Sequence, residues 1–273
     1  MSKHHQLEIL HRAPAPGAAR NAPPLLFVHG AYVGAWCWED TFLPYFAGLG
    51  YDCHALSLVG HAGSAGRERL DLCSIGDYLR DLADVAEKLA APPVVIGHSL
   101  GGYLVQRHAR KQPVAGVALL ASVPPYGLGG SLAYMGLSAP HLLGALNRFQ
   151  WHLGPDGLDY ALLRELLFSP AMTRERLGAF AARAQPESTL ALTELLMPQP
   201  WLLMGMPHDV PCLVLGAERD RIIPRADVLA TARAWRVDAE FVDIGHALMV
   251  DSGWEQVAQR LANWLAVGFG GAR

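Results

Sequence analysis

The sequence lacks the features that mark several classes of protein. Its 273 residues contain only 4 cysteines, without Cys-x-x-Cys spacing, so a disulfide scaffold is not indicated and we expect reduced, mostly buried thiols. The formal net charge of −3 provides no basic surface, so we expect no nucleic-acid partner. The chain also has no His-Glu-x-x-His, no Gly-x-Gly-x-x-Gly and no phosphate loop. We therefore expect no catalytic metal and no nucleotide cofactor.

We expect neither a secretory signal nor a membrane span. Residues 1–6 are polar and do not begin a secretory signal, so we expect a cytoplasmic protein. Residues 113–147 contain no Asp, Glu, Lys or Arg, but the apolar run at 114–123 is too short to cross a bilayer. Pro125 and Pro140 interrupt the apolar residues beyond that run. The pattern predicts a buried strand that leads into an apolar segment, and no integral membrane span.

What the chain has is an alternation of short apolar runs and helical stripes. Apolar residues make up 51% of it, which is enough to bury a large core. Ser74 and Asp77 resemble a capping box, and Ile75, Leu79 and Leu82 then recur at helical spacing. The alternation predicts an α/β fold with a mostly parallel sheet and helices on both of its faces. The predicted strands lie near residues 7–10, 25–28, 94–96, 114–123, 212–217 and 239–244.

The most informative motif is Gly-His-Ser-Leu-Gly at residues 97–101. It follows a short apolar run and opens an expected helix, as in the strand, turn and helix that present a nucleophilic serine. Glycines are needed around such a turn because a Cβ would strike the neighbouring strand or helix. We predict that Ser99 is a nucleophile. The alternative is an ordinary turn between a strand and a helix.

A nucleophilic serine needs a base that takes its proton and a carboxylate that orients the base. Asp220 lies on the loop after one predicted strand, and His246 lies on the loop after the next. Both loops follow the carboxyl ends of parallel strands, where they converge on the turn that carries Ser99. We predict a Ser99, Asp220 and His246 triad. Other carboxylates near these strands precede a strand or lie within it: Asp209, Asp238 and Asp243.

Two backbone N–H groups are the candidates for an oxyanion hole. The apolar run at 25–28 ends in His29-Gly30, after which the N–H of Ala31 can point into the site. Leu100, the residue after the predicted nucleophile, supplies the second donor. We interpret His29 as a residue that braces its loop. Tyr32 is the weaker candidate for the first donor, and its ring is a candidate for the pocket lining.

These motifs resemble those of the α/β-hydrolase superfamily, in particular its cap-bearing lipase, esterase and thioesterase-like members. The resemblance rests on His29-Gly30 with Trp36 and Trp38 after it, and on residues 97–102, 216–224 and 245–246. It spans nearly the whole chain and implies the α/β-hydrolase fold with an inserted helical cap. Many relatives carry Asp-x-Arg-Gly-His-Gly-x-Ser after the second core strand. This chain has Ser-Leu-Val-Gly-His-Ala-Gly-Ser at residues 57–64, which leaves the bracing of that loop open.

The segment between the strands near 114–123 and 212–217 has no sheet pattern. We expect a hydrolase core at residues 1–123 and 208–273 and a helical cap at 124–207, with helices at 158–168, 173–184 and 187–197. Large apolar side chains are frequent in this segment, which indicates an apolar pocket beneath it. The pocket candidates are Tyr32, His98, Tyr126 and Trp201.

Taken together, the motifs predict a serine hydrolase that cleaves a carboxylic ester or thioester with an apolar acyl or alcohol portion. The expected partner is therefore a small-molecule substrate. A fold does not determine the function of the protein that has it. Acyl transfer, perhydrolysis and C–C bond cleavage on the same triad are therefore alternatives. A receptor that keeps the pocket without turnover is a further alternative.

Overall fold

The computed structural model describes residues 6–17, 21–151, 159–199 and 205–269. Within this part, seven strands form one sheet in the order β1-β3-β2-β4-β5-β6-β7. All neighbouring strands are parallel except β1, which is antiparallel to β3 at one edge. The predicted α/β fold with a mostly parallel sheet is confirmed. The strands are β1 (Ile9–Arg12), β2 (Leu25–Val28), β3 (Cys53–Leu56), β4 (Val94–His98), β5 (Gly116–Leu120), β6 (Cys212–Ala217) and β7 (Ala239–Val242).

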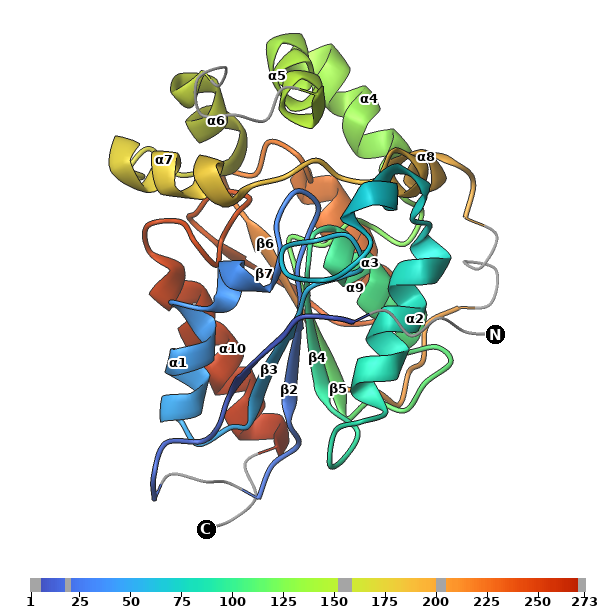
Figure 1. Cartoon of the computed structure of the whole chain (residues 1–273), viewed down its shortest axis with the longest axis vertical. Helices are drawn as coiled ribbons and strands as arrows, with labels where there is room; N and C mark the ends of the chain where they lie inside the picture. Colours follow the sequence, from blue (N-terminus) through green and yellow to red (C-terminus); the bar gives the residue numbers. More distant parts are fainter. Residues whose placement is uncertain (1–5, 18–20, 152–158, 200–204, 270–273) are drawn as a thin grey trace.

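Helices cover both faces of this sheet (Figure 1). On one face α1 (Phe42–Gly48) contacts α10 (Trp254–Phe269), and on the other lie α2 (Ile75–Ala86), α3 (Leu100–His108) and α9 (Arg225–Trp235). Among the described residues, two short 3-10 helices lie on the connections: η1 (Ala35–Trp38) and η2 (Arg67–Leu72). In the described part of the chain, no helix combines the length and the apolar character that crossing a bilayer requires.

The central strands are buried on both faces, which is why their sequences are continuous apolar runs. Every residue of β2 and β4 is buried, as is expected of parallel strands between two helical layers. The capping box before α2 is confirmed, since the Ser74 hydroxyl accepts from the Asp77 N–H and Asp77 accepts from the Ser74 N–H. The edge strand β1 begins two positions later than predicted, at Ile9.

In the described part of the segment between β5 and β6, five helices stand beyond the end of the sheet, at the top of Figure 1. They are α4 (Gly129–Ser138), α5 (Pro140–Trp151), α6 (Tyr160–Leu167), α7 (Arg174–Arg183) and α8 (Thr189–Leu196). The last three match the helices predicted from sequence. Helices α4 and α5 did not appear in the prediction, because Gly129 and Pro140 look like interruptions; instead, both residues begin a helix. Proline is well suited to a first helical position, where its missing N–H costs no helical hydrogen bond.

Candidate active site

Ser99 occupies a strained turn at the carboxyl end of β4. Its backbone has φ 51° and ψ −116°, a region that residues with a side chain rarely adopt. The flanking glycines are required by close packing. A Cβ on Gly97 would lie 2.5 Å from the Gly101 carbonyl oxygen, and one on Gly101 would lie 2.4 Å from the carbonyl oxygens of Val28 and His29. The local sequence therefore holds the Ser99 side chain out at the end of the sheet.

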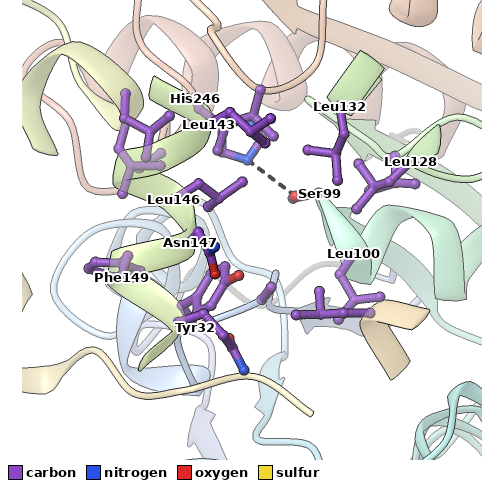
Figure 2. Close-up of a pocket in the computed structure, with 18 of the residues that line it drawn as sticks. Tyr32, Ser99, Leu100, Leu128, Leu132, Leu143, Leu146, Asn147, Phe149 and His246 are labelled. Atoms are coloured by element: carbon purple, nitrogen blue, oxygen red, sulfur yellow. Dashed lines mark hydrogen bonds between the residues drawn. The ribbon is translucent and has the colours of Figure 1, made fainter. Parts of the chain in front are cut away.

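The Ser99 hydroxyl lies 3.1 Å from His246 Nε2 (Figure 2). On the other side of the imidazole, His246 Nδ1 lies 2.8 Å from Asp220 Oδ2. The structure thus brings together the three residues predicted from sequence, although they are far apart along the chain. The side chains of His246 and Asp220 are only 5% and 1% exposed. The other Asp220 oxygen, Oδ1, accepts from the N–H groups of Ile222 and Ile223, both at 2.8 Å. Asp220 is therefore held in place with an oxygen aimed at the imidazole.

The competing carboxylate on the neighbouring loop points elsewhere. Asp243 follows β7 and accepts from the Arg219 guanidinium, and its side chain is 66% exposed. This ion pair with Arg219 holds the pKa of Asp243 below its usual value. Asp243 is consequently ionised, but it is committed to a surface pair rather than to His246.

Two residues hold the His246 loop, and only one of them was a candidate from sequence. His98, predicted as a pocket residue, lines the pocket and donates from Nε2 to the His246 carbonyl oxygen at 2.9 Å. Burial holds the pKa of His98 well below its usual value, so this imidazole is neutral. Asp251, which sequence reasoning missed, is fully buried and accepts from the N–H groups of Gly245 and Ser169. The only sequence signal for it is an acidic residue in an otherwise apolar stretch.

The predicted oxyanion donors belong to residues that line the same pocket as Ser99, namely Ala31 and Leu100. Neither backbone N–H has an acceptor among the described residues. Two residues before Ala31, His29 Nε2 accepts from the Leu58 N–H at 3.0 Å. His29 Nδ1 therefore carries the proton, and it donates to the Gly30 carbonyl at 2.7 Å. Burial, together with the nearby His61, lowers the pKa of His29 to about 3, which keeps it neutral.

A pocket of about 600 Å³ opens above Ser99. Leucines from the inserted helices surround the serine, and Tyr32 and Asn147 lie on one side of it (Figure 2). The polar members of the lining are few: Tyr32, His98, Ser99, Asn147, Gln150 and His246. Leucines from the insertion dominate the rest: Leu128, Leu132, Leu143, Leu146, Leu166, Leu167, Leu192, Leu195 and Leu196.

Two of the pocket candidates are not placed in this lining. Tyr126 is absent from it, because its hydroxyl is directed to Asp227 at 2.5 Å, which connects the segment before α4 to α9. The sequence around Tyr126 gives no indication of that partner. Trp201 lies outside the described residues. Tyr32 does line the pocket, and its ring packs edge-on against Phe149 of α5.

A buried carboxylate ties the insertion to the core below it. Glu187, which precedes α8, is fully buried, and its oxygens accept from His61 Nε2 at 3.1 Å and from the Tyr78 hydroxyl at 2.6 Å. Burial alone would raise the pKa of Glu187, but His61 and the bonds from Tyr78 and Ser188 lower it. The nearby Gln185 N–H donates to the Tyr32 carbonyl. The loop at residues 57–64, which departs from the common motif, is thus braced from the insertion.

The chain also matches a known protein family by sequence. A sequence profile described as the alpha/beta hydrolase family matches residues 25–260. The chain belongs to this family. The match begins with β2 and ends within α10, so it includes the predicted nucleophile, acid and base.

Curated relatives share shorter stretches with the chain. The pyrethroid hydrolase of Sphingobium wenxiniae is 33% identical over 103 residues, which cover 36% of this chain and 35% of that protein. Methyl jasmonate esterase 1 of Vitis vinifera is 39% identical over 84 residues, 29% of this chain and 31% of that protein. The chain spans about a third of the length of these curated relatives.

Solved structures of the same fold match over almost the full length. An esterase from Thermogutta terrifontis superimposes with a TM-score of 0.72 at 20% identity, covering 97% of this chain and 94% of that one. A soluble variant of monoglyceride lipase from Saccharomyces cerevisiae gives a TM-score of 0.74 at 13% identity, covering 98% and 94%. These likenesses establish the α/β-hydrolase fold.

Proposed function

We propose that this protein is a serine hydrolase that cleaves a carboxylic ester or thioester with an apolar acyl or alcohol portion. The observation that carries the proposal is the hydrogen-bonded row from Ser99 through His246 to Asp220, at the floor of an apolar pocket. Relatives named as a hydrolase and as esterases support it, as does membership of the family.

Ser99, His246 and Asp220 each have a separate role in the proposed reaction. The Ser99 oxygen attacks the substrate carbonyl carbon while His246 Nε2 takes the hydroxyl proton. Asp220 stabilises the imidazolium that forms and keeps Nδ1 protonated. The negative oxygen of the tetrahedral intermediate accepts from the N–H groups of Ala31 and Leu100.

Collapse of this intermediate breaks the bond to the alcohol or thiol, which leaves with the proton from His246. Ser99 then carries the acyl group. Water, deprotonated by the same imidazole, attacks the acyl-enzyme through a second tetrahedral intermediate, and the carboxylic acid is released. The serine regains its proton, so the cycle needs no other reactant.

We further propose that residues 124–207 act as a cap that shapes the substrate site. Helices α4, α5, α6 and α8 each contribute leucines to the lining, so the insertion determines what fits above Ser99. Polar side chains are few in it, which favours an apolar group near the ester. Burial, together with the charge of Glu187, raises the pKa of Tyr32, so its hydroxyl keeps its proton.

Hydrolysis of p-nitrophenyl esters of increasing acyl length tests the proposal. We expect kcat/KM to rise by up to about fourfold for each added CH₂ while the pocket fills, and then to level off. Ser99→Ala should abolish the turnover, whereas Ser138→Ala, which changes an exposed serine on α4, should leave it unchanged. Equal turnover by Ser99→Ala would contradict the proposed nucleophile. A flat series with an active Ser99 would contradict only the apolar site.

A further inference from the structure

A second cluster of titratable side chains lies away from Ser99. His11 is on β1, His54 is on β3, and Asp52 directly precedes β3. Asp52 is thus at the amino end of the parallel strands, whereas Ser99 follows the carboxyl end of β4. The cluster therefore takes no part in the proposed hydrolysis, and the inference drawn from it does not rest on that proposal.

Strand register brings the three side chains together. His11 and His54 are directly opposite each other in the antiparallel pair of β1 and β3. Asp52 is two positions before His54, so the alternation along a strand places both side chains on the same face. Cys53, between them, is fully buried on the other face and does not join the group.

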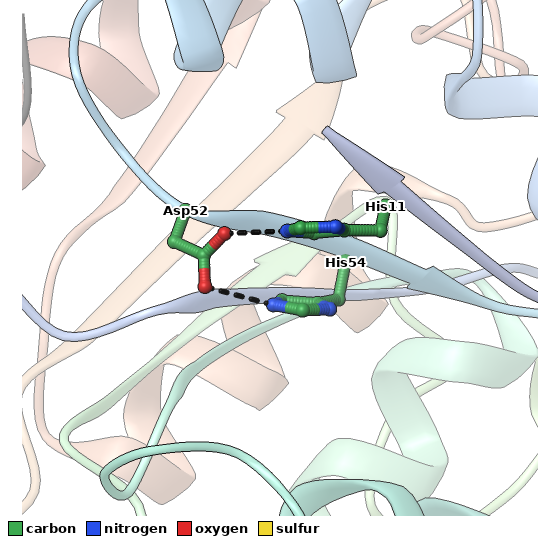
Figure 3. A group of neighbouring side chains, drawn as sticks. All are labelled: His11, Asp52 and His54. Carbon is green, nitrogen blue, oxygen red and sulfur yellow. Dashed lines mark hydrogen bonds and ion pairs between the residues drawn. The ribbon is translucent and has the colours of Figure 1, made fainter. Parts of the chain in front are cut away.

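The imidazoles converge on the carboxylate (Figure 3). His11 Nε2 lies 2.7 Å from Asp52 Oδ1, and His54 Nε2 lies 3.0 Å from Asp52 Oδ2. The two rings are stacked, with centroids 4.5 Å apart and planes inclined by 16°. One ligand atom from each residue lies within 4.8 Å of the other two.

This arrangement has the donors and the spacing of a metal site. Tetrahedral zinc at bond lengths of about 2.0–2.1 Å places neighbouring ligand atoms roughly 3.3 Å apart, so rotations of these side chains suffice to close the group around one ion. The side chains of His11 and Asp52 are 51% and 43% exposed, which leaves them free to move and leaves room for water. Two imidazoles and one carboxylate favour zinc and other transition metals over magnesium or calcium, which prefer oxygen ligands.

We propose that His11, Asp52 and His54 bind one Zn²⁺ ion, with water completing its coordination. The ion would cross-link β1 to β3. Within the described sheet β1 is an edge strand with β3 as its only neighbour, so the cross-link acts at an edge of the sheet. Zinc binding to the folded protein should consequently raise its melting temperature. It should leave ester hydrolysis unchanged.

Isothermal titration calorimetry of chelator-treated protein with ZnCl₂ tests this site. Parent and variants all carry His4→Asn and His5→Asn, which remove the adjacent histidines near the start of the sequence. We expect one Zn²⁺ per chain, and an affinity at least about tenfold weaker in His11→Asn, His54→Asn and Asp52→Asn. The matched control is His141→Asn, an exposed histidine that faces a single carboxylate, Glu165, and it should bind zinc like the parent.

Thermal melting of the same proteins provides a second readout. Zinc should raise the melting temperature of the parent and of His141→Asn, but not that of His11→Asn, whose exposed position makes misfolding a poor explanation. Binding of less than one zinc per chain, or equal zinc affinity in the parent and His11→Asn, would overturn the proposal. The cluster would then be an ion pair of two histidines with Asp52.

Discussion

His61 and Glu187 form an ion pair in which neither side chain is exposed, with His61 Nε2 3.1 Å from Glu187 Oε2. The pair joins the loop after β3 to the segment that precedes α8. It therefore connects the core to the proposed cap at a buried point beside the pocket. A charge at such a position is costly when its partner is removed, because water cannot replace the partner.

Glu187→Gln should lower the free energy of unfolding by about 3 kcal/mol, as expected when one member of a buried pair is lost. Urea denaturation measures it. The control is Glu39→Gln, which breaks an exposed pair with Arg183 and should cost less than about 1 kcal/mol. If the two variants lost the same stability, the pair would not anchor the insertion.

Glu187→Gln should also raise KM for the ester, because the backbone N–H of Gln185, near Glu187, donates to the carbonyl of the pocket residue Tyr32.

Asp220→Asn should lower kcat by roughly 10⁴, because the imidazole loses the carboxylate that orients it and holds its tautomer. Asp243→Asn is the matched control, since that side chain is paired with Arg219 on the surface. Ester hydrolysis by the purified variants measures both. An active Asp220→Asn beside an inactive Asp243→Asn would show that the acid had been assigned to the wrong loop.

His29→Leu should lower kcat more than it changes KM. The His29 imidazole holds the Gly30 carbonyl, and in a trans peptide the N–H of Ala31 points the opposite way, so the bond sets the direction of one oxyanion donor. A misdirected donor should cost roughly tenfold to a hundredfold in kcat, less than its complete loss. His108→Leu, which removes another buried histidine whose pKa is lowered by burial, should leave kcat unchanged. A change in KM alone would argue against this role of His29.

Asp81 should make the protein less stable as the pH rises. Burial, aided by Asp77 and Asp84, raises the pKa of Asp81 to about 6, although the hydrogen bond from the Val59 N–H lowers it. Because the folded pKa is above the unfolded one, the folded state binds more protons between pH 4 and 6, and stability falls over that range. Relative to Asp81→Asn, the wild type should lose up to about 3 kcal/mol between those values. Parallel stability profiles of the two proteins would contradict the shift.

Much of the fold can be predicted from patterns that are local in sequence. The apolar runs of β2 and β4 predict buried parallel strands, and the motif around Ser99 predicts the turn between β4 and α3. Helices α4 and α5 escaped prediction because glycine and proline usually interrupt helices, whereas here Gly129 and Pro140 lie at helix starts. In that position their effect on helix stability is small.

The contacts that escaped prediction depend on partners distant in sequence. Tyr126 is directed to Asp227, and Glu187 pairs with His61, and neither partner has a spacing that a motif could reveal. The pairing of His11 with His54 depends on the register of two strands, which alternation alone does not specify. The roles of Ser99, Asp220 and His246 stay predictions, although the structure brings their side chains together.

Covalent labelling of Ser99 tests the central claim most directly. An alkyl fluorophosphonate reacts with an activated serine because its adduct resembles the tetrahedral intermediate. Mass spectrometry of digested protein should find one adduct per chain, on Ser99, formed rapidly by the wild type, slowly by His246→Ala and not at all by Ser99→Ala. Absence of the adduct from folded wild-type protein, or labelling of His246→Ala at the wild-type rate, would contradict the account of Ser99 as a nucleophile activated by His246.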